Sequence, residues 1–228
     1  TIALPEDAGG GGGSVCDQAV ALEACARALL PGGLLGATVG GLLAGRPGRF
    51  GVQVHPGGVV WDGGTASEHL LLDEGDVTPV AGLDLTARHG RVAGASARPA
   101  ADSGPAERRR LLAVTLAAAE AAGVARWCLE TAVAHAKVRE QFGRPIGAFQ
   151  AVKHLCAEML ETAEAVTAAA WDAASAADGA AASGDDEQWR FAADVAQTTC
   201  FDGAVEVAKT CVQVLGGIGF TFEHDAHL

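Results

Sequence analysis

The stretch Arg-Glu-Gln-Phe-Gly-Arg-Pro-Ile, residues 139–146, separates two long segments with helical patterns. Gly143 and Pro145 should end the first helix, because glycine takes left-handed backbone angles easily and proline has no amide hydrogen. Arg139 falls at this helix end, where a guanidinium complements the helix dipole or binds phosphate oxygens through its planar fork of N–H donors. The stretch therefore predicts two long helices joined by a turn that carries a candidate anion ligand.

A second informative stretch, Gln-Val-Leu-Gly-Gly-Ile-Gly-Phe-Thr-Phe-Glu, occupies residues 213–223. Glycines after a helix commonly form its C-terminal cap, and paired glycines also let a dinucleotide lie against the backbone. The spacing is not that of a Rossmann fingerprint, and no strand precedes it. At the level of the residues, a helix cap and a part of a nucleotide site both stay open.

From Gly104 almost to its end, the sequence predicts helices on both sides of residues 139–146. Apolar residues recur at helical spacing, and Pro105 suits a first helical turn. We expect one helix from there to about Gln141, a second over 147–178 that ends near Gly179, and a third to about Val214. Three long antiparallel helices predict a bundle, assigned to a C-terminal helical domain over residues 104–228.

Residues 1–45 predict an N-terminal helical segment. Ser14 is a plausible N-cap for a helix that continues to about Leu30, and a shorter helix should cover 34–44. The run Gly9–Gly13 lacks the Lys-Ser/Thr pair of a phosphate loop, so we interpret it as a flexible turn.

Residues 46–103 change character and predict a small β-rich domain. Glycine and proline punctuate short runs with alternating or β-branched residues, which is typical of strands joined by tight turns. The expected strands lie at 50–55, 59–61, 69–73, 77–81 and 91–95.

The amino-acid composition limits the classes of protein to which this chain can belong. In 228 residues, 49% are hydrophobic and 19% charged, as in a globular protein, and the net charge of −12 argues against a nucleic-acid binder. We expect no membrane-spanning helix and no secretory signal, hence a cytoplasmic protein, although a targeting segment could precede the first residue. Six cysteines without a CxxC pair predict reduced thiols and no metal site.

Together the two stretches resemble the acyl-CoA dehydrogenase family of flavoenzymes. The ending Glu-His-Asp-Ala-His-Leu, residues 223–228, resembles an actinobacterial subset of this family, some members of which are heteromeric. The resemblance implies FAD as the cofactor. In the family, the first motif reaches the FAD of a neighbouring subunit, and the second lines its adenosine-diphosphate half across the same boundary. The matching FAD-binding positions are Arg139, Phe142, Gln150, Gln213, Gly216 and Gly217.

The same resemblance implies the fold and the partners. We expect a mainly α protein with a small β module, in which the family's middle β domain is reduced or incomplete. Trp61 is followed by Asp62-Gly63 and departs from the Trp-Ile-Thr/Ser element that family members place against the flavin. The implied partners are an acyl-CoA substrate, electron-transfer flavoprotein or a similar acceptor, and either further copies of the chain or a second acyl-CoA dehydrogenase subunit in a heterotetramer.

The family's reaction is α,β-desaturation of an acyl-CoA, in which a carboxylate removes the α-proton and flavin takes the β-hydride. One family position for this base lies beyond residue 228. The other falls, in register with Arg139, at Ala113, next to Val114. Glu107 and Glu120 are close but out of register, so the sequence assigns no catalytic base.

The resulting hypothesis is an FAD-dependent acyl-CoA dehydrogenase or one subunit of it. The alternative is a non-catalytic FAD-binding or scaffold subunit of a heteromeric enzyme, and a third candidate is an oxidase or monooxygenase on the same fold. Two further motifs have open interpretations. Residues 108–110, three arginines, could meet CoA phosphates or form a solvated helix start, and residues 223–227 read as the acidic first turn of another helix rather than as a metal cluster.

Overall fold

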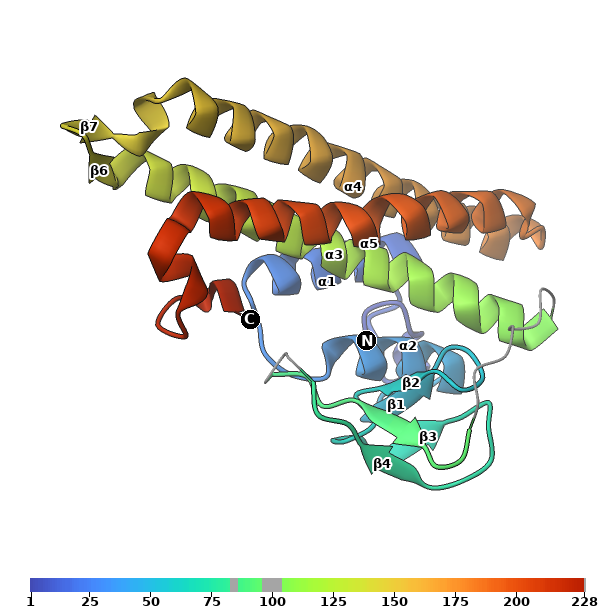
Figure 1. Ribbon diagram of the computed structural model, residues 1–228. Helices are drawn as coiled ribbons and strands as arrows, with labels where there is room; N and C mark the ends of the chain where they lie inside the picture. Colours follow the sequence, from blue (N-terminus) through green and yellow to red (C-terminus); the bar gives the residue numbers. More distant parts are fainter. Residues whose placement is uncertain (83–85, 96–103, 228) are drawn as a thin grey trace.

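Two layers make up the protein. The computed structural model describes residues 1–82, 86–95 and 104–227. Long helices form one layer, and a small β-sheet with a short helix lies below it (Figure 1). The predicted mainly α fold with a small β module is therefore confirmed, while the proposed limits of three domains stay a prediction, and the limit at 103 falls outside the described residues.

The helical layer contains α3 (Gly104–Val138), α4 (Gln150–Ser183) and α5 (Glu187–Leu215), which run antiparallel side by side, with α1 (Val15–Arg27) packed across α3 and α4 (Figure 1). Their shared core is mostly alanine: Ala122 on α3, Ala170 on α4 and Ala196 on α5 are fully buried. Because an alanine side chain is a single methyl group, the helix axes can approach closely. The predicted bundle is confirmed.

Helix ends follow their capping residues. Ser14 forms the expected N-cap of α1, in a capping box with Asp17. The predicted end of α4 at Gly179 was wrong: this glycine lies inside the helix, which continues to Ser183 and ends at Gly184 with a left-handed φ of 76°. A Cβ at Gly179 would meet no atom within 4 Å, so nothing there forces the chain to turn.

α3 also ends earlier than expected, at Val138 rather than Gln141. The reason is a small hairpin in which β6 (Glu140–Gln141) pairs antiparallel with β7 (Arg144–Pro145). A short 3-10 helix, η2 (Ile146–Ala148), then leads into α4. Two more such helices, η3 (Gly216–Phe220) and η4 (Asp225–His227), follow α5.

The sheet has the order β3-β1-β2-β5-β4. β1 (Phe50–Gln53) pairs parallel with β3 (Glu68–Leu70), and the pairs with β2 (Val59–Trp61), β5 (Gly90–Val92) and β4 (Val77–Pro79) are antiparallel. All five predicted strands are confirmed, most of them shorter than expected.

The short helix α2 (Leu34–Ala44) packs on β1 at close range. A Cβ at Gly40 would lie 2.2 Å from the Cβ of Phe50, so only glycine allows this approach. Another short segment at the N-terminus, η1 (Glu6–Ala8), precedes the glycine run.

The arginines at 108–110 pair within the helical layer, except Arg109, which joins it to the sheet. Arg108 pairs with Asp186, and Arg110 pairs with Glu107 and Asp194. Arg109 donates from Nη1 to the backbone carbonyls of Gln53 and Leu70, at 3.3 and 3.1 Å, and burial lowers its pKa. These contacts support structural roles for the three side chains.

One helix, α3, is long and apolar enough to cross a membrane by length and composition alone. Most of its apolar window is buried inside the bundle, as expected for the core helix of a globular protein. Such a helix is weak support for a membrane span.

Candidate functional site

A strained turn presents Phe142. The two residues between β6 and β7, Phe142 and Gly143, have φ of 54° and 77°, the left-handed pair typical of a type I′ hairpin turn. Such a φ is uncommon for phenylalanine and costs backbone strain, which concentrates at functional sites. The Phe142 ring is 91% exposed and meets Phe149 edge-on, 6.0 Å between ring centroids. The sequence predicted a turn here, but nothing in it indicated that Phe142 takes the strained position.

Arg139 lies at the base of this hairpin. Its N–H donates to the carbonyl of His135 at 2.8 Å, and its own carbonyl accepts from Ile146 at 2.7 Å. The side chain is exposed. Burial, followed by the charge of Arg139 and the neighbouring His224, lowers the pKa of His135. Arg139 therefore presents an exposed positive charge on a chain of net charge −12.

The second motif surrounds the end of α5. Gln213 and Gly217 are exposed, and Gly216 has a left-handed φ of 65°. No atom lies within 4 Å of a Cβ added at Gly216 or Gly217, so their backbone is open to a flat ligand. Gly219 differs, because a Cβ there would lie 2.9 Å from the carbonyl oxygen of Val212. Two glycines of the motif therefore leave backbone accessible, and the third serves packing.

The fold brings both motifs to one end of the bundle, where the β6–β7 hairpin and η3 lie (Figure 1). The segment after η3 folds back against α3, with His224 6.4 Å from Trp127 between ring centroids and close to His135. Gln150, in the first turn of α4, is also exposed and contacts His154 at 3.1 Å. Of the six FAD-binding positions expected from the resemblance, only Gly216 is partly covered.

This end of the bundle fits a dinucleotide cofactor in its chemistry. An exposed guanidinium matches pyrophosphate oxygens, an exposed ring gives a stacking or edge contact, and open glycine backbone allows close approach. The residues lie on an outer surface rather than inside a cleft of the same chain. They are therefore suited to a cofactor held between two chains.

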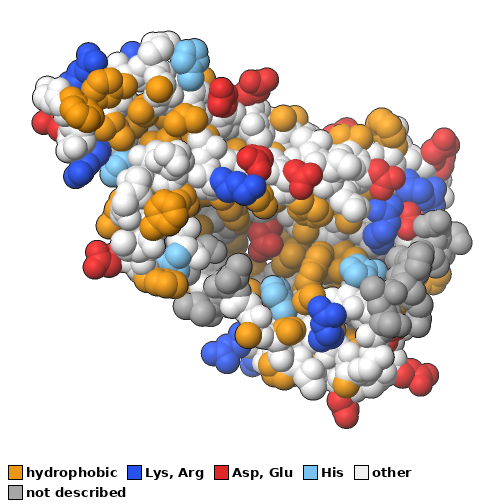
Figure 2. Space-filling view, viewed as in Figure 1, with side chains coloured by type: hydrophobic (Ala, Val, Ile, Leu, Met, Phe, Trp, Pro, Cys, Tyr) orange, Lys and Arg blue, Asp and Glu red, His pale blue; other side chains and the backbone are white. Residues whose placement is uncertain are grey.

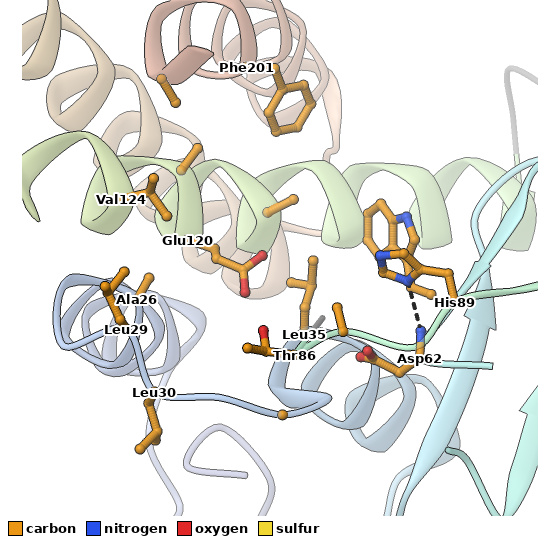
Figure 3. Close-up of a pocket in the computed structure, with 16 residues that line it drawn as sticks. Ala26, Leu29, Leu30, Leu35, Asp62, Thr86, His89, Glu120, Val124 and Phe201 are labelled. Atoms are coloured by element: carbon orange, nitrogen blue, oxygen red, sulfur yellow. Dashed lines mark hydrogen bonds between the residues drawn. The ribbon is translucent and has the colours of Figure 1, made fainter. Parts of the chain in front are cut away.

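A separate cavity of about 440 Å³ lies between the layers. Figure 2 shows this face hollowed between the bundle and the sheet, with hydrophobic side chains gathered in the hollow. The end of α1 and the turn after it form one wall, α3 and α5 form another, and β2 with the segment before β5 closes the third (Figure 3). Most of the lining is aliphatic or aromatic.

Asp62, Thr86 and His89 are the polar residues on the sheet side of this cavity (Figure 3). Asp62 is buried, and its Oδ2 accepts the Gly36 N–H at 2.7 Å, in the first turn of α2. Its own N–H donates to Nδ1 of His89 at 3.3 Å. A carboxylate at a helix N-terminus is stabilised by the helix dipole. Asp62 thus positions α2 against the sheet.

Glu120 reaches the same cavity from α3 (Figure 3). By contrast, Ala113 is fully buried in the core and does not line the cavity. Glu107 is also buried, and the hydrogen bond from Arg110, with the charges of Arg110 and Arg190, holds the pKa of its carboxyl low despite burial. Of the three positions weighed from the sequence, only Glu120 lines this cavity.

The residues near the chain end form no metal centre among the described residues. Asp225–His227 is a single 3-10 turn, in which Nδ1 of His224 accepts the Ala226 N–H at 3.0 Å. All six cysteines carry free thiols.

Comparison with known proteins settles the family. The model of the acyl-CoA dehydrogenase C-terminal domain matches residues 113–227. The chain belongs to the acyl-CoA dehydrogenase family. It is 35% identical to the acyl-CoA dehydrogenase IpdE2 of Mycobacterium tuberculosis, a match that covers all of this chain and 74% of IpdE2. It is 44% identical to the acyl-CoA dehydrogenase FadE34 of the same organism, but spans only 36% of that protein's length.

Solved acyl-CoA dehydrogenases share the fold. A variant of the Tcur3481-Tcur3483 steroid ACAD superposes with a TM-score of 0.78 at 25% identity, over 99% of this chain and 77% of that one. The ChsE4-ChsE5 complex from Mycobacterium tuberculosis gives 0.73 at 22% identity, over 98% and 76%. The family is one of flavin-dependent oxidoreductases that act on CH–CH bonds, so the expected family and enzyme class are confirmed.

Proposed function

We propose that this chain binds FAD at a boundary between subunits and takes part in the α,β-desaturation of an acyl-CoA. The observation that carries the proposal is the gathering of two distant motifs at one exposed end of the bundle. Family membership supplies the reaction class, and the cavity between the layers is the space available to an acyl chain. Electron-transfer flavoprotein or a similar carrier would reoxidise the enzyme.

Each of the proposed residues has a role that fits its place. The Arg139 guanidinium would bind the pyrophosphate of FAD, and the Phe142 ring would pack against the cofactor from the hairpin tip. Gln150 and Gln213 would donate or accept hydrogen bonds, while the backbone at Gly216 and Gly217 would lie along the adenosine-diphosphate half. When bound, FAD supplies the acceptor for the β-hydride.

The partner is either a second copy of this chain or a related acyl-CoA dehydrogenase subunit. The similarity to one chain of the ChsE4-ChsE5 complex favours the heteromeric arrangement. The similarity to a steroid ACAD favours a CoA thioester on the side chain of a steroid over a simple fatty acyl-CoA. Both are proposals about this chain.

A non-catalytic FAD-binding or scaffold subunit is the second candidate function. Ala113 favours it, because the family position for a base on this helix carries a methyl group that cannot accept a proton. The exposed Arg139 and the open glycines favour cofactor binding over pure scaffolding.

The test compares Arg139→Ala with Lys137→Ala, which removes the same charge from an exposed side chain at the same end of α3. Losing a charge-assisted hydrogen bond costs about 1.5–3 kcal/mol, so we expect FAD affinity to fall roughly 10- to 100-fold in Arg139→Ala only. The measurements are FAD binding by fluorescence titration and acyl-CoA-dependent bleaching of the flavin.

Three outcomes separate the candidates. Weaker FAD binding in Arg139→Ala, together with bleaching by the wild type, supports the catalytic proposal. FAD binding without any bleaching supports a non-catalytic subunit. Equal FAD affinity in both variants overturns the proposed role of this end of the bundle.

A further inference from the structure

Three cysteines from three helices gather at one level of the bundle. Cys128 on α3 and Cys211 on α5 are 5% and 1% exposed and belong to one hydrophobic core. Their thiols form a hydrogen bond with each other. Cys156 on α4 is only partly buried, and it lies close enough to Cys211 for the two groups to interact electrostatically. The bundle thus holds a thiol pair with a third thiol beside it.

The register between α4 and α5 independently places Cys156 opposite Cys211. The Cys200 thiol on α5 donates to the carbonyl of Val166 on α4 at 3.3 Å. Cys211 lies eleven residues further along α5, and eleven residues back from Val166 is residue 155. Because the two helices run antiparallel and rise equally per residue, residue 155 and its neighbour Cys156 lie at the level of Cys211 (Figure 1).

The two thiols of the pair differ in chemistry. Their hydrogen bond, followed by burial, raises the pKa of Cys128, whereas the same bond lowers the pKa of Cys211 although burial opposes it. Cys128 is therefore the donor, and Cys211 is the sulfur that takes the negative charge. A thiolate is the nucleophile in thiol oxidation, and a buried thiol in apolar surroundings is inert. Cys200 is of the inert kind, because burial raises its pKa to about 12.

The pair lies beside the second motif. Cys211 is near the end of α5, two residues before Gln213. The carbonyl of the next residue, Val212, is the atom against which η3 packs, since a Cβ added at Gly219 would lie 2.9 Å from it. A movement of Cys211 would therefore move the helical turn on which the glycine segment rests.

A covalent bond between the two sulfur atoms would cause such a movement. An S–S bond is about 2.05 Å long, much shorter than the contact between two unbonded thiols. Bundle cores are close-packed, so neighbouring groups shift with the sulfur atoms. The last turns of α5 would be drawn toward α3 and fixed there.

We propose that Cys128 and Cys211 form a reversible disulfide that weakens FAD binding at the neighbouring glycine motif. The oxidant is hydrogen peroxide, which is small enough to enter beside the partly exposed Cys156. The inference rests on the proposed function, because it needs FAD at this end of the bundle. Formation of the disulfide itself does not depend on FAD.

The oxidation has two steps. The Cys211 thiolate attacks one peroxide oxygen, so that an S–O bond forms and the O–O bond breaks. The hydroxide that leaves takes up the proton that Cys211 had lost and becomes water. The Cys128 sulfur then attacks the Cys211 sulfur, the S–S bond forms, and hydroxide leaves with the Cys128 proton as a second water. Two thiols lose two electrons, and the peroxide is reduced.

The first measurement maps the disulfide. The reduced protein is treated with hydrogen peroxide, remaining thiols are blocked with iodoacetamide, and tryptic peptides are analysed by mass spectrometry without reduction. Trypsin cleaves after Lys and Arg, so Cys128, Cys156, Cys200 and Cys211 fall on four different peptides. We expect the peptide 127–137 to be joined to the peptide that begins at residue 210, and dithiothreitol to separate them.

The second measurement is FAD affinity, by fluorescence titration, before and after oxidation. We expect the affinity of the wild type to fall roughly 3- to 10-fold, as for the loss of one hydrogen bond, and to return with dithiothreitol. Cys128→Ala removes the donor that makes Cys211 reactive, so its FAD affinity should not respond to peroxide. Cys200→Ala, which removes a buried thiol from the same helix as Cys211, should respond as the wild type does.

Three results overturn the inference: no joined peptides from the oxidised, folded wild type, a Cys156–Cys211 disulfide in place of the expected one, or an equal fall in FAD affinity in Cys128→Ala and the wild type. Joined peptides with unchanged FAD affinity overturn the control of cofactor binding. Circular dichroism verifies that each variant is folded. A reduced wild type that does not bind FAD overturns the proposed function instead, and the peptide map then tests the disulfide by itself.

Discussion

At the scale of the residue, Glu107 and Glu120 on α3 have different surroundings. Glu107 is 3% exposed, with Arg110 3.0 Å and Arg190 3.3 Å away, and is held ionised. Glu120 is half-buried and lines the cavity between the layers. The two glutamates on this helix therefore lie in different surroundings, one sealed beside guanidinium groups and the other at the border of a cavity.

Glu107→Gln should lower stability by about 1.5 kcal/mol at pH 7, since a charge-assisted hydrogen bond is replaced by a weaker one. The pKa of Glu107 is depressed in the folded state, so its contribution is present above the unfolded pKa and is lost as pH falls through the folded one, below about pH 4. Urea unfolding between pH 7 and pH 3 measures the difference between variant and wild type.

The matched control is Glu206→Gln, whose pair with Lys209 is 65% exposed on both sides. Surface pairs contribute little, so its stability should stay near wild type at every pH. A gap between Glu107→Gln and wild type that stays constant down to pH 3 would contradict the assigned role of this charge.

At the scale of the element, the sequence predicted most boundaries because turn residues mark them. The limits of α2 at Leu34 and Ala44 and of β2 at Val59 and Trp61 agree with the expectation. The helix end predicted at Gly179 was wrong, because a helix can continue through a glycine. The β6–β7 hairpin was also missed, because its strands have two residues each and show no periodicity.

Two helical glycines give a matched prediction. Gly123→Ala places a methyl group against the backbone of α1 and should cost about 1–3 kcal/mol, as overpacking does. Gly179→Ala meets open space and should stabilise the protein by roughly 0.5–1 kcal/mol, through backbone entropy. Thermal unfolding of both variants checks the pair; equal effects would contradict the close approach of α1 to α3.

At the scale of the whole molecule, the candidate cofactor residues and the cavity come from different parts of the fold. The motif residues could be named from the sequence, because each motif is contiguous. The cavity could not, since Leu30, Trp61, Glu120 and Phe201 meet only when α1, the sheet, α3 and α5 have packed.

The close approach at Gly123 also limits how this gene can change. Every single-nucleotide missense change of a glycine codon encodes a residue with a Cβ, and any Cβ here meets the carbonyl of Glu23. Descendants that keep α1 against α3 should therefore keep this glycine, even where the residues that line the cavity diverge with the substrate.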